Sequence, residues 1–322
     1  MRMKTPEQLK GAIKNIAKDK KLKPQEVLQM FLFARIVERL SLSRYKDNFI
    51  LKGGLLISSM IGAEGRSTLD MDTTVIGIPM EEEHIHQVIL ELLQLDVGDG
   101  IQFVFEKMEP IREDDAYNNF RVHIRASYGK IDAPMKIDIT TGDRITPAAI
   151  TYSYRFLFEE RSVPVMAYSI ETILAEKYET IIRRNIGTTR ARDFCDLYIL
   201  YKSRFDEIRM PIFKLAVENT ARKRGSSEEI EEWLEICEDI KKEPALERLW
   251  NNYRKDNQYA SDISFEDIVK NLYEVGNQLE RTISMSNKTI SDELDSSEKQ
   301  ILLEEELDVR KPINNLSEKH KC

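Results

Sequence analysis

Apolar residues at helical spacing predict two helices at the start of the chain. Thr5, Pro6 and Glu7 are typical of a helix cap and first turn, and Lys23-Pro24 is typical of a second helix start. The apolar positions of the two helices are Leu9, Ile13, Ile16 and Ala17, followed by Val27, Phe31, Phe33, Ile36 and Leu40. We therefore expect an N-terminal helical region over residues 1–48.

Alternation of apolar and polar residues predicts strands in the next part of the chain. The candidates are residues 69–75, 101–108, 119–127 and 135–140, with a helix over residues 80–95. The second and third candidates alternate well enough to favour a hairpin-like pair in an antiparallel or mixed sheet, with the first candidate inside that sheet. Residues 49–168 are therefore expected to form an α+β core.

Helical spacing returns at residue 169 and continues to about residue 279. Its apolar anchors include Trp233, Leu234 and Ile240, then Leu246, Trp250 and Tyr253, then Ile268, Leu272 and Val275. We expect residues 169–282 to form a helical domain that completes a cleft against the core. Residues 283–322 are rich in Ser, Glu, Lys and Asn and have no aromatic residue. Such a composition buries too little apolar area to offset the entropy of ordering, so we expect a flexible, dispensable tail.

Composition narrows the class of protein. The chain of 322 residues is 41% hydrophobic and 32% charged, which is typical of soluble globular proteins, and no apolar run is long enough for a membrane span. Its three cysteines are widely separated and lack metal-ligand spacing, so we expect reduced thiols and a cytoplasmic location. The net charge is −8, but Arg183, Arg184, Arg190 and Arg192 cluster around one turn. That cluster predicts contact with a nucleic-acid backbone or a triphosphate; a solvated loop is the alternative.

The most informative motif joins paired glycines to paired carboxylates. Gly53-Gly54 lacks side chains that would keep phosphates from its amides, and it could begin a helix whose N-terminus favours anions. Asp70 and Asp72 would share one face of a strand while Met71 points into the core. Such carboxylates repel unless a cation lies between them, and Mg²⁺ is typically bound by one or two carboxylates together with substrate phosphates. The motif therefore indicates phosphoryl or nucleotidyl transfer.

A third carboxylate is a candidate for the same site. Strand 135–140 would place Lys136, Asp138 and Thr140 on one face. If this strand lies beside Asp70 and Asp72, Asp138 completes a two-metal site. The alternative is a solvated position next to Lys136, because strand neighbours do not follow from sequence.

These residues resemble the AbiEii/AbiGii nucleotidyltransferase-like toxins of bacterial toxin–antitoxin and abortive-infection (phage-defence) systems. The resemblance lies in residues 39–45, 49–54 and 66–72, and it continues with a lysine motif at Lys177 and an aspartate motif at Asp193. Asp196 is the second candidate for that last aspartate. The resemblance implies a DNA polymerase β-like core with a mixed sheet. It also implies an adjacently encoded antitoxin as a partner, and RNA, particularly the tRNA 3′ end, as the acceptor.

The lysine and aspartate motifs can also be interpreted from their local sequence, without the resemblance. Lys177 would lie beside the apolar face of a helix, where it could reach a triphosphate or could only cover the core with its stem. Asp193 would lie on the flank of a helix over residues 191–201, whose buried residues would be Phe194, Leu197, Tyr198 and Tyr201. The structural alternative is a carboxylate favoured by the helix dipole. The order of the motifs favours the functional reading.

Together these features predict an Mg²⁺-dependent nucleotidyltransferase that moves a nucleoside monophosphate from a nucleoside triphosphate to an acceptor and arrests growth. Asp70, Asp72 and Asp138 would bind metal, and Asp193 would bind metal or act as the base. Nucleotide-binding residues would be Gly53, Gly54, Arg66, Thr68 and Lys177. Two alternatives stay open, an enzyme that modifies a protein hydroxyl and a non-catalytic nucleotide sensor.

Overall fold

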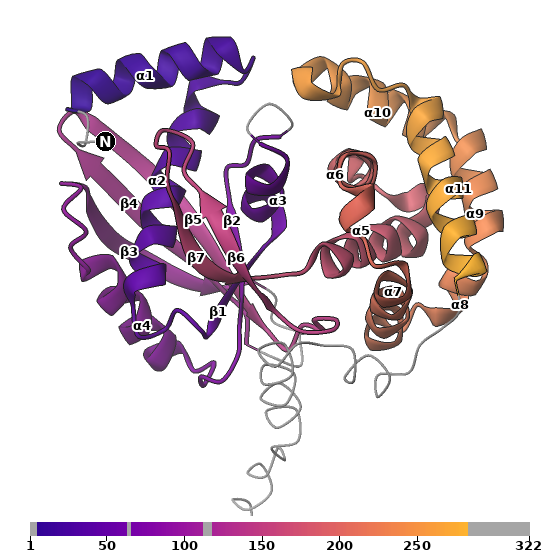
Figure 1. Ribbon diagram of the computed structural model, residues 1–322, viewed down its shortest axis with the longest axis horizontal. Coiled ribbons are helices and arrows are strands. Elements are labelled where there is room, and N and C mark those ends of the chain that lie inside the picture. The colour runs from indigo at the N-terminus through magenta and orange to yellow at the C-terminus, as the bar shows by residue number, and fades with distance from the viewer. Residues whose placement is uncertain (1–4, 63–65, 112–117, 283–322) are drawn as a thin grey trace, which may run out of the picture.

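The computed structural model describes residues 5–62, 66–111 and 118–282 (Figure 1). Figure 1 shows two parts, one built on a twisted sheet and one built of helices. The predicted tail from residue 283 lies outside the described residues. None of the described helices is long and apolar enough to cross a membrane.

A mixed sheet of seven strands forms the first part, which confirms the α+β fold class. The strands are β1 (Phe49–Lys52), β2 (Met71–Val75), β3 (Gln102–Pro110), β4 (Phe120–Tyr128), β5 (Ile131–Thr141), β6 (Ile150–Arg155) and β7 (Ser162–Ala167). Their order across the sheet is β3-β4-β5-β2-β1-β7-β6. β2 runs parallel to β5 and antiparallel to β1, so the strand that follows the glycine motif lies in the middle of the sheet, as predicted.

The four predicted strands exist, but three more were missed. β1 has only four residues, of which the first three are buried, so it shows no alternation. β6 and β7 form an antiparallel hairpin at the sheet edge, with three exposed residues in β6 and Pro164 in β7. Short buried strands and irregular edge strands carry a weak periodic signal, which explains these omissions.

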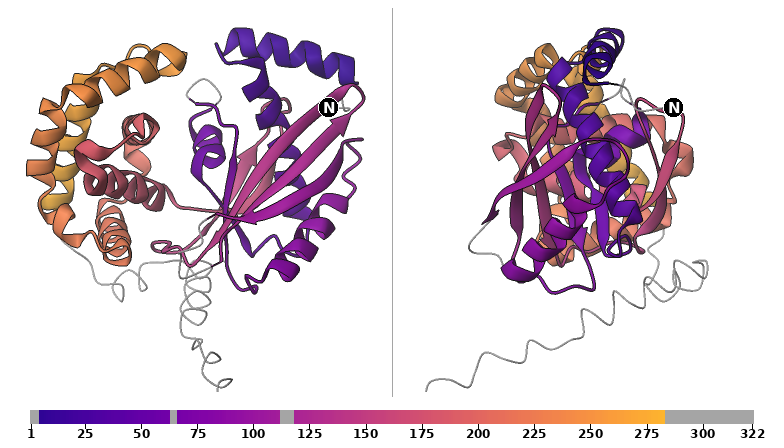
Figure 2. Two further views of the ribbon diagram at one scale, coloured as in Figure 1. Left: turned by 180° about the vertical axis from the view of Figure 1, so that it is seen from behind. Right: turned by 90° about the vertical axis from the view of Figure 1, so that its left-hand side faces the viewer.

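Four helices accompany the sheet, namely α1 (Pro6–Asp19), α2 (Pro24–Leu42), α3 (Gly53–Ile61) and α4 (Glu82–Gln94). The side chain of Thr5 caps α1 in a capping box with Gln8, as its sequence suggested. α2 packs against β7 and α4, and α4 packs against β3. Figure 2 shows these two helices lying along the sheet. α3 begins at Gly53, so the paired glycines do start a helix.

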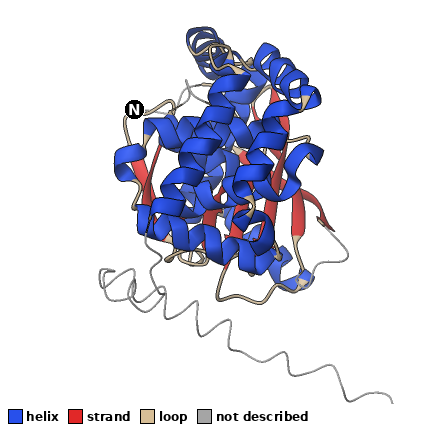
Figure 3. Ribbon diagram, turned by 90° about the vertical axis from the view of Figure 1, so that its right-hand side faces the viewer, coloured by secondary structure: helices blue, strands red, loops and turns tan. Residues whose placement is uncertain are grey.

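The second part contains α5 (Ile170–Arg184), α6 (Ala191–Ser203), α7 (Met210–Arg224), α8 (Ser227–Glu231), α9 (Trp233–Lys242), α10 (Pro244–Asp256) and α11 (Phe265–Arg281). Figure 3 shows these helices in front of the strands. α5 begins three residues after β7, where the side chain of Ser169 accepts a hydrogen bond from the backbone N–H of Thr172 at 3.2 Å. α3 of the sheet part contacts α6, which brings the glycine motif and the late aspartate motif together.

A glycine in α11 holds the helical part together by close packing. A Cβ added at Gly276 would lie 2.2 Å from the ring of Trp233 in α9. We expect Gly276→Ala to lower the free energy of unfolding by about 1–3 kcal/mol, because overpacking forces neighbours apart. Gly11→Ala is the matched control, since that helical glycine has nothing within 4 Å and alanine favours helix. Denaturant unfolding of both variants measures the difference, and equal stabilities would contradict this account.

Candidate active site

A cleft of about 720 Å³ lies between the sheet part and the helical part. Every residue predicted for the site lines this one cleft, namely Gly53, Gly54, Arg66, Thr68, Asp70, Asp72, Asp138, Lys177 and Asp193. On the side of the sheet part, they come from α3, from the segment before β2, and from β2 and β5. On the side of the helical part, they come from α5 and α6. The chain therefore brings together residues that are more than a hundred positions apart.

A row of charged residues crosses four neighbouring strands at the base of the cleft. Lys52 on β1 pairs in register with Asp72 on β2, Asp72 with Asp138 on β5, and Asp138 with Arg121 on β4. Directly opposite residues on adjacent strands hold their side chains close together. The row therefore places two carboxylates side by side with a cation at each end. Of the two positions left open for Asp138, the one beside the strand of Asp72 is observed.

The two carboxylates have different surroundings. Asp138 accepts two hydrogen bonds from Arg121, from Nε to Oδ1 and from Nη2 to Oδ2, both at 2.8 Å. Burial raises the pKa of Asp72 above its ordinary value; Lys52 opposes that shift and the neighbouring Asp138 adds to it. Asp70 immediately precedes β2 and is half-buried in the cleft. Asp72 is thus an ionisable group whose charge lacks full compensation.

The donor chemistry of this row fits a hard divalent cation. Within the described ranges, no group of three or more His, Cys, Asp or Glu side chains is placed to hold a metal. Both oxygens of Asp138 already bind Arg121, which leaves Asp70 and Asp72 as the carboxylates most open to a metal. Two carboxylates completed by substrate phosphates are a typical Mg²⁺ arrangement.

The paired glycines leave room for the side chains of Asp72, Arg66 and Thr68. Gly53 has φ +61°, and a Cβ there would lie 2.0 Å from Asp72 Oδ2. A Cβ at Gly54 would lie 2.3 Å from Arg66 Nη1 and 2.7 Å from Thr68 Oγ1. The N–H of Gly54 is 3.4 Å from Asp72 Oδ2 and donates to it. The start of α3 therefore holds a carboxylate of the protein, and phosphate binding by these amides stays a prediction.

We expect Gly53→Ala to reduce nucleotidyl transfer at least 10-fold, because the added methyl would displace the Asp72 carboxylate and a 1 Å misplacement can cost 100-fold. Gly225→Ala is the matched control. Gly225 has φ +67°, so alanine carries a similar backbone strain there, but nothing lies within 4 Å. Initial rates of both variants, normalised to folded protein, check this. Equal losses would show that backbone strain alone accounts for the effect.

The late motifs form a buried ionic network across the cleft. Lys177 Nζ lies 2.6 Å from Asp193 Oδ1 and 3.0 Å from Asp196 Oδ2. Arg66 Nε donates to Asp196 Oδ1 at 2.5 Å, and its Nη2 donates to Oδ2 at 3.2 Å. Burial opposes the charge of Lys177, yet Asp196 and Asp193 outweigh it and raise the lysine's pKa. Arg66 was predicted to bind nucleotide; the structure shows it bound to Asp196.

The two candidate aspartates of the last motif are distinguished by their positions. Asp196 is 1% exposed and satisfied by Arg66 and Lys177, whereas Asp193 lines the cleft. Asp193 Oδ2 is buried and accepts no hydrogen bond from the described residues, with Arg190 Nη1 at 3.8 Å. Asp193 was predicted on the helix flank near the helix start; it lies in the first turn of α6 and is buried beside Lys177 of α5. Tyr198, predicted to be buried, is half-buried.

Several cleft residues were missed by sequence reasoning. Lys52 Nζ donates to Asp143 Oδ2 at 2.5 Å and to Thr140 Oγ1 at 2.7 Å. Burial raises the pKa of Glu176, which lies one residue before Lys177. The position of Lys52 directly before the glycines, and of Glu176 beside the motif lysine, were the available signals. α10 contributes Leu249, Asn252, Tyr253 and Asp256, none of which was predicted for the site.

The predicted arginine cluster is divided. Arg190 and Arg192 line the cleft and are exposed. Arg183 instead donates from Nε to Glu179 Oε1 at 2.7 Å. Only part of the cluster is therefore placed to meet a bound anion.

Comparison with known proteins gives the following matches. A family model described as the nucleotidyl transferase AbiEii toxin of type IV toxin–antitoxin systems matches residues 35–271. A search among curated proteins gave no significant match.

Three solved structures are similar in part. JHP933 from Helicobacter pylori has 14% identity and a TM-score of 0.48, covering 80% of this chain and 93% of that chain. A candidate nucleotidyltransferase from H. pylori has 14% identity and a TM-score of 0.49, covering 85% of this chain and all of that chain. An antigenic nucleotidyltransferase-like protein from Paracoccidioides brasiliensis has 15% identity and a TM-score of 0.34, covering 60% and 89%.

The family model spans the glycine motif, the carboxylate pair and both late motifs, which meet in one cleft. Because the match extends over most of the chain, this protein belongs to the AbiEii nucleotidyl transferase toxin family of type IV toxin–antitoxin systems.

Proposed function

We propose that the protein transfers a nucleoside monophosphate from a nucleoside triphosphate to a hydroxyl of RNA, with the tRNA 3′ end as the acceptor. The observation that carries the proposal is the row of Lys52, Asp72 and Asp138, which lines one cleft together with Lys177 and Asp193. A volume of about 720 Å³ lies within the usual range for a small-molecule site, about 300–1,000 Å³.

Asp70 and Asp72 would hold Mg²⁺. A bound Mg²⁺ ion would neutralise phosphate charge as the bond to the leaving pyrophosphate breaks. Lys177 stands across the cleft and would add a positive charge to the phosphates, since its two aspartate partners keep it protonated. Thr68 lines the same edge as a predicted nucleotide contact. Arg66 would act through Asp196, holding α6 in place, because its guanidinium is already bound there.

Asp193 is the residue best placed to act as a base among the late motifs. Lys177 engages its Oδ1 atom, while Oδ2 is buried without a hydrogen bond from the described residues. In the transfer, the acceptor hydroxyl gives its proton to Asp193 and its oxygen bonds to the α-phosphorus. The bond from that phosphorus to the bridging oxygen breaks, and pyrophosphate leaves. Modification of RNA in this way would arrest translation, and a cognate antitoxin would relieve the arrest.

The test is incubation of the purified chain with each nucleoside triphosphate in turn, radiolabelled at the α-phosphate, together with total bacterial RNA or lysate protein. Reactions contain Mg²⁺ or excess chelator, and Asp72→Asn serves as the inactive control. We expect label in RNA from one nucleotide, dependent on Mg²⁺ and absent from the control. Label in protein would overturn the RNA acceptor, and label in neither would overturn the proposed transfer.

A further inference from the structure

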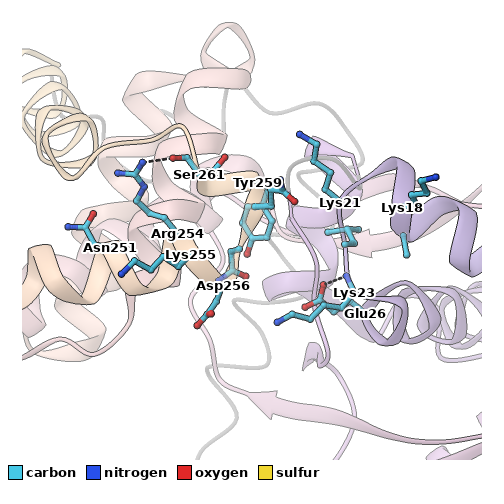
Figure 4. Close-up of a pocket in the computed structure, with 14 residues that line it drawn as sticks. Lys18, Lys21, Lys23, Glu26, Asn251, Arg254, Lys255, Asp256, Tyr259 and Ser261 are labelled. Carbon is cyan, nitrogen blue, oxygen red and sulfur yellow. Dashed lines mark hydrogen bonds between the residues drawn. The ribbon is translucent and has the colours of Figure 1, made fainter.

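A second groove, distinct from the cleft, lies between the N-terminal helices and α10 (Figure 4). Its volume is about 1030 Å³. One wall is the end of α1 and the turn into α2, and the other is the end of α10 with the short helix η3 (Gln258–Ala260). Figure 1 shows α1 and α10 facing each other across this opening. Neither wall carries a residue of the glycine, carboxylate, lysine or aspartate motifs.

The groove is basic in a protein of net charge −8. Its lining includes Lys18, Lys21 and Lys23 from one wall and Arg254 and Lys255 from the other. Figure 4 shows the lysines on one wall and Arg254 and Lys255 on the other, with the Arg254 guanidinium hydrogen-bonded to the backbone oxygen of Ser261. The acidic lining residues are Glu26 and Asp256. Glu26 is already engaged, because its Oε2 accepts the backbone N–H of Lys23 at 3.2 Å. A local concentration of cations attracts polyanions whatever the overall charge.

The groove joins the catalytic cleft along α10. Asp256 lines both spaces. Tyr253 lines the cleft and Tyr259 lines the groove, and their hydroxyls are hydrogen-bonded at 2.7 Å. Successive residues of one helix thus face the two spaces, with Asn252 toward the cleft and Asn251 toward the groove. A strand lying in the groove would therefore lie next to the cleft.

We propose that this groove binds the phosphate backbone of the acceptor RNA and directs its end into the cleft. The inference that the RNA end points into the cleft rests on the proposed function. The location of the binding site rests on the basic residues of the groove and on Asp256, which lines both spaces. Lysine and arginine side chains on opposite walls would each contact a phosphate of a strand that passes between them. Tyr259, which is half-buried at the junction, offers an aromatic face for a base. An aromatic platform beside cations fits a nucleic acid better than an acidic protein.

The test compares two charge-matched triple variants of the full chain. The groove variant is Lys18→Gln/Lys21→Gln/Lys255→Gln. The control is Lys46→Gln/Lys130→Gln/Lys270→Gln, which removes three exposed lysines that do not line the groove. Glutamine at Lys21 keeps a side chain at its φ of +55°, so backbone strain is unchanged. Thermal unfolding of each variant shows whether it is folded.

Binding of a fluorescently labelled bacterial tRNA is measured over a range of salt concentrations. Each phosphate contact contributes about 0.7–0.9 to the slope of log K against log salt, so loss of three contacts should lower the slope by about 2 and weaken binding roughly 100-fold at 0.1 M salt. The control should match the wild type. An unchanged slope in a folded groove variant would overturn the proposal. Poly-L-glutamate that displaces the tRNA equally well per charge would also overturn it, in favour of an acidic protein.

The labelling assay separates this proposal from the proposed function. If the groove variant loses tRNA affinity while wild-type protein labels no RNA, RNA binding in the groove is supported and the proposed transfer reaction is contradicted. If wild-type protein labels RNA and the groove variant binds tRNA normally, the proposed transfer is supported and RNA binding in the groove is contradicted.

Discussion

Replacement of Asp72 by asparagine is expected to abolish nucleotidyl transfer and at the same time to raise the melting temperature. Asparagine keeps the shape of the side chain and can still accept the N–H of Gly54. It removes the negative charge that, in the proposed function, helps to hold Mg²⁺. We expect the rate to fall by more than about 100-fold, because even the outer partners of metal ligands cost about 10- to 100-fold.

The gain in stability follows from the direction of the Asp72 pKa shift. Burial raises this pKa above its ordinary value of 3.8, with Lys52 opposing and Asp138 adding to the shift. The folded state therefore binds the proton more tightly than the unfolded state does. As pH rises from below the unfolded pKa through the folded pKa, the wild-type protein loses this contribution to its stability. A permanently neutral asparagine does not lose it, so the difference in melting temperature should appear at neutral pH and vanish in acid.

Melting temperatures measured without Mg²⁺ or nucleotide over a pH series test this prediction. Asp47→Asn is the control, because Asp47 is exposed in the turn before β1 and lies outside the cleft. It should leave both activity and stability unchanged. An Asp72→Asn protein that melts below the wild type at neutral pH would show that Asp72 stabilises the fold. The negative charge of Asp72 would then be better compensated by its neighbours than the geometry indicates.

The ion pair between Arg66 and Asp196 is expected to give the largest loss of stability. The two side chains are 3% and 1% exposed, and they join the loop before β2 to α6. Arg66→Met and Asp196→Leu should each lower the free energy of unfolding by about 3–5 kcal/mol, because each leaves a buried charge without its main partner. The double variant should lose less than the sum of the singles, since no charge of the pair remains.

The pair should also make stability depend on pH. Burial opposes ionisation of Asp196, but Arg66 and Lys177 outweigh it and lower its pKa. Its contribution is therefore present above the unfolded pKa and is lost as pH falls through the folded pKa. Urea unfolding of the wild type and three variants at several pH values completes the double-mutant cycle. Lys202→Met removes an exposed ion pair with Glu274 and should cost no more than about 1 kcal/mol. Strictly additive losses for Arg66 and Asp196 would mean that the two side chains do not stabilise each other.

Local sequence patterns were enough to predict the two N-terminal helices and four of the seven strands of the described sheet. The helix starts at Thr5 and Pro24, the alternation in β4 and β5, and the helical spacing of α5 and α6 each depend on residues a few positions apart. Such short-range patterns depend little on the contacts that the rest of the chain makes. The order of the glycine, carboxylate, lysine and aspartate motifs likewise needed no coordinates.

Which of those residues act on one another follows only from the tertiary structure. The row from Lys52 to Asp138 depends on strand order, since β1, β2 and β5 are separated by long connections in the chain, whereas Arg121 reaches Asp138 across the tight hairpin of β4 and β5. Arg66 and Asp196 are 130 residues apart, and either could have faced solvent on the evidence of its neighbours. The basic groove exists only because the end of α1 and the end of α10, which are far apart in the chain, line the same space. Contacts of this kind arise from burial of whole faces against each other, and no local pattern encodes which faces will meet.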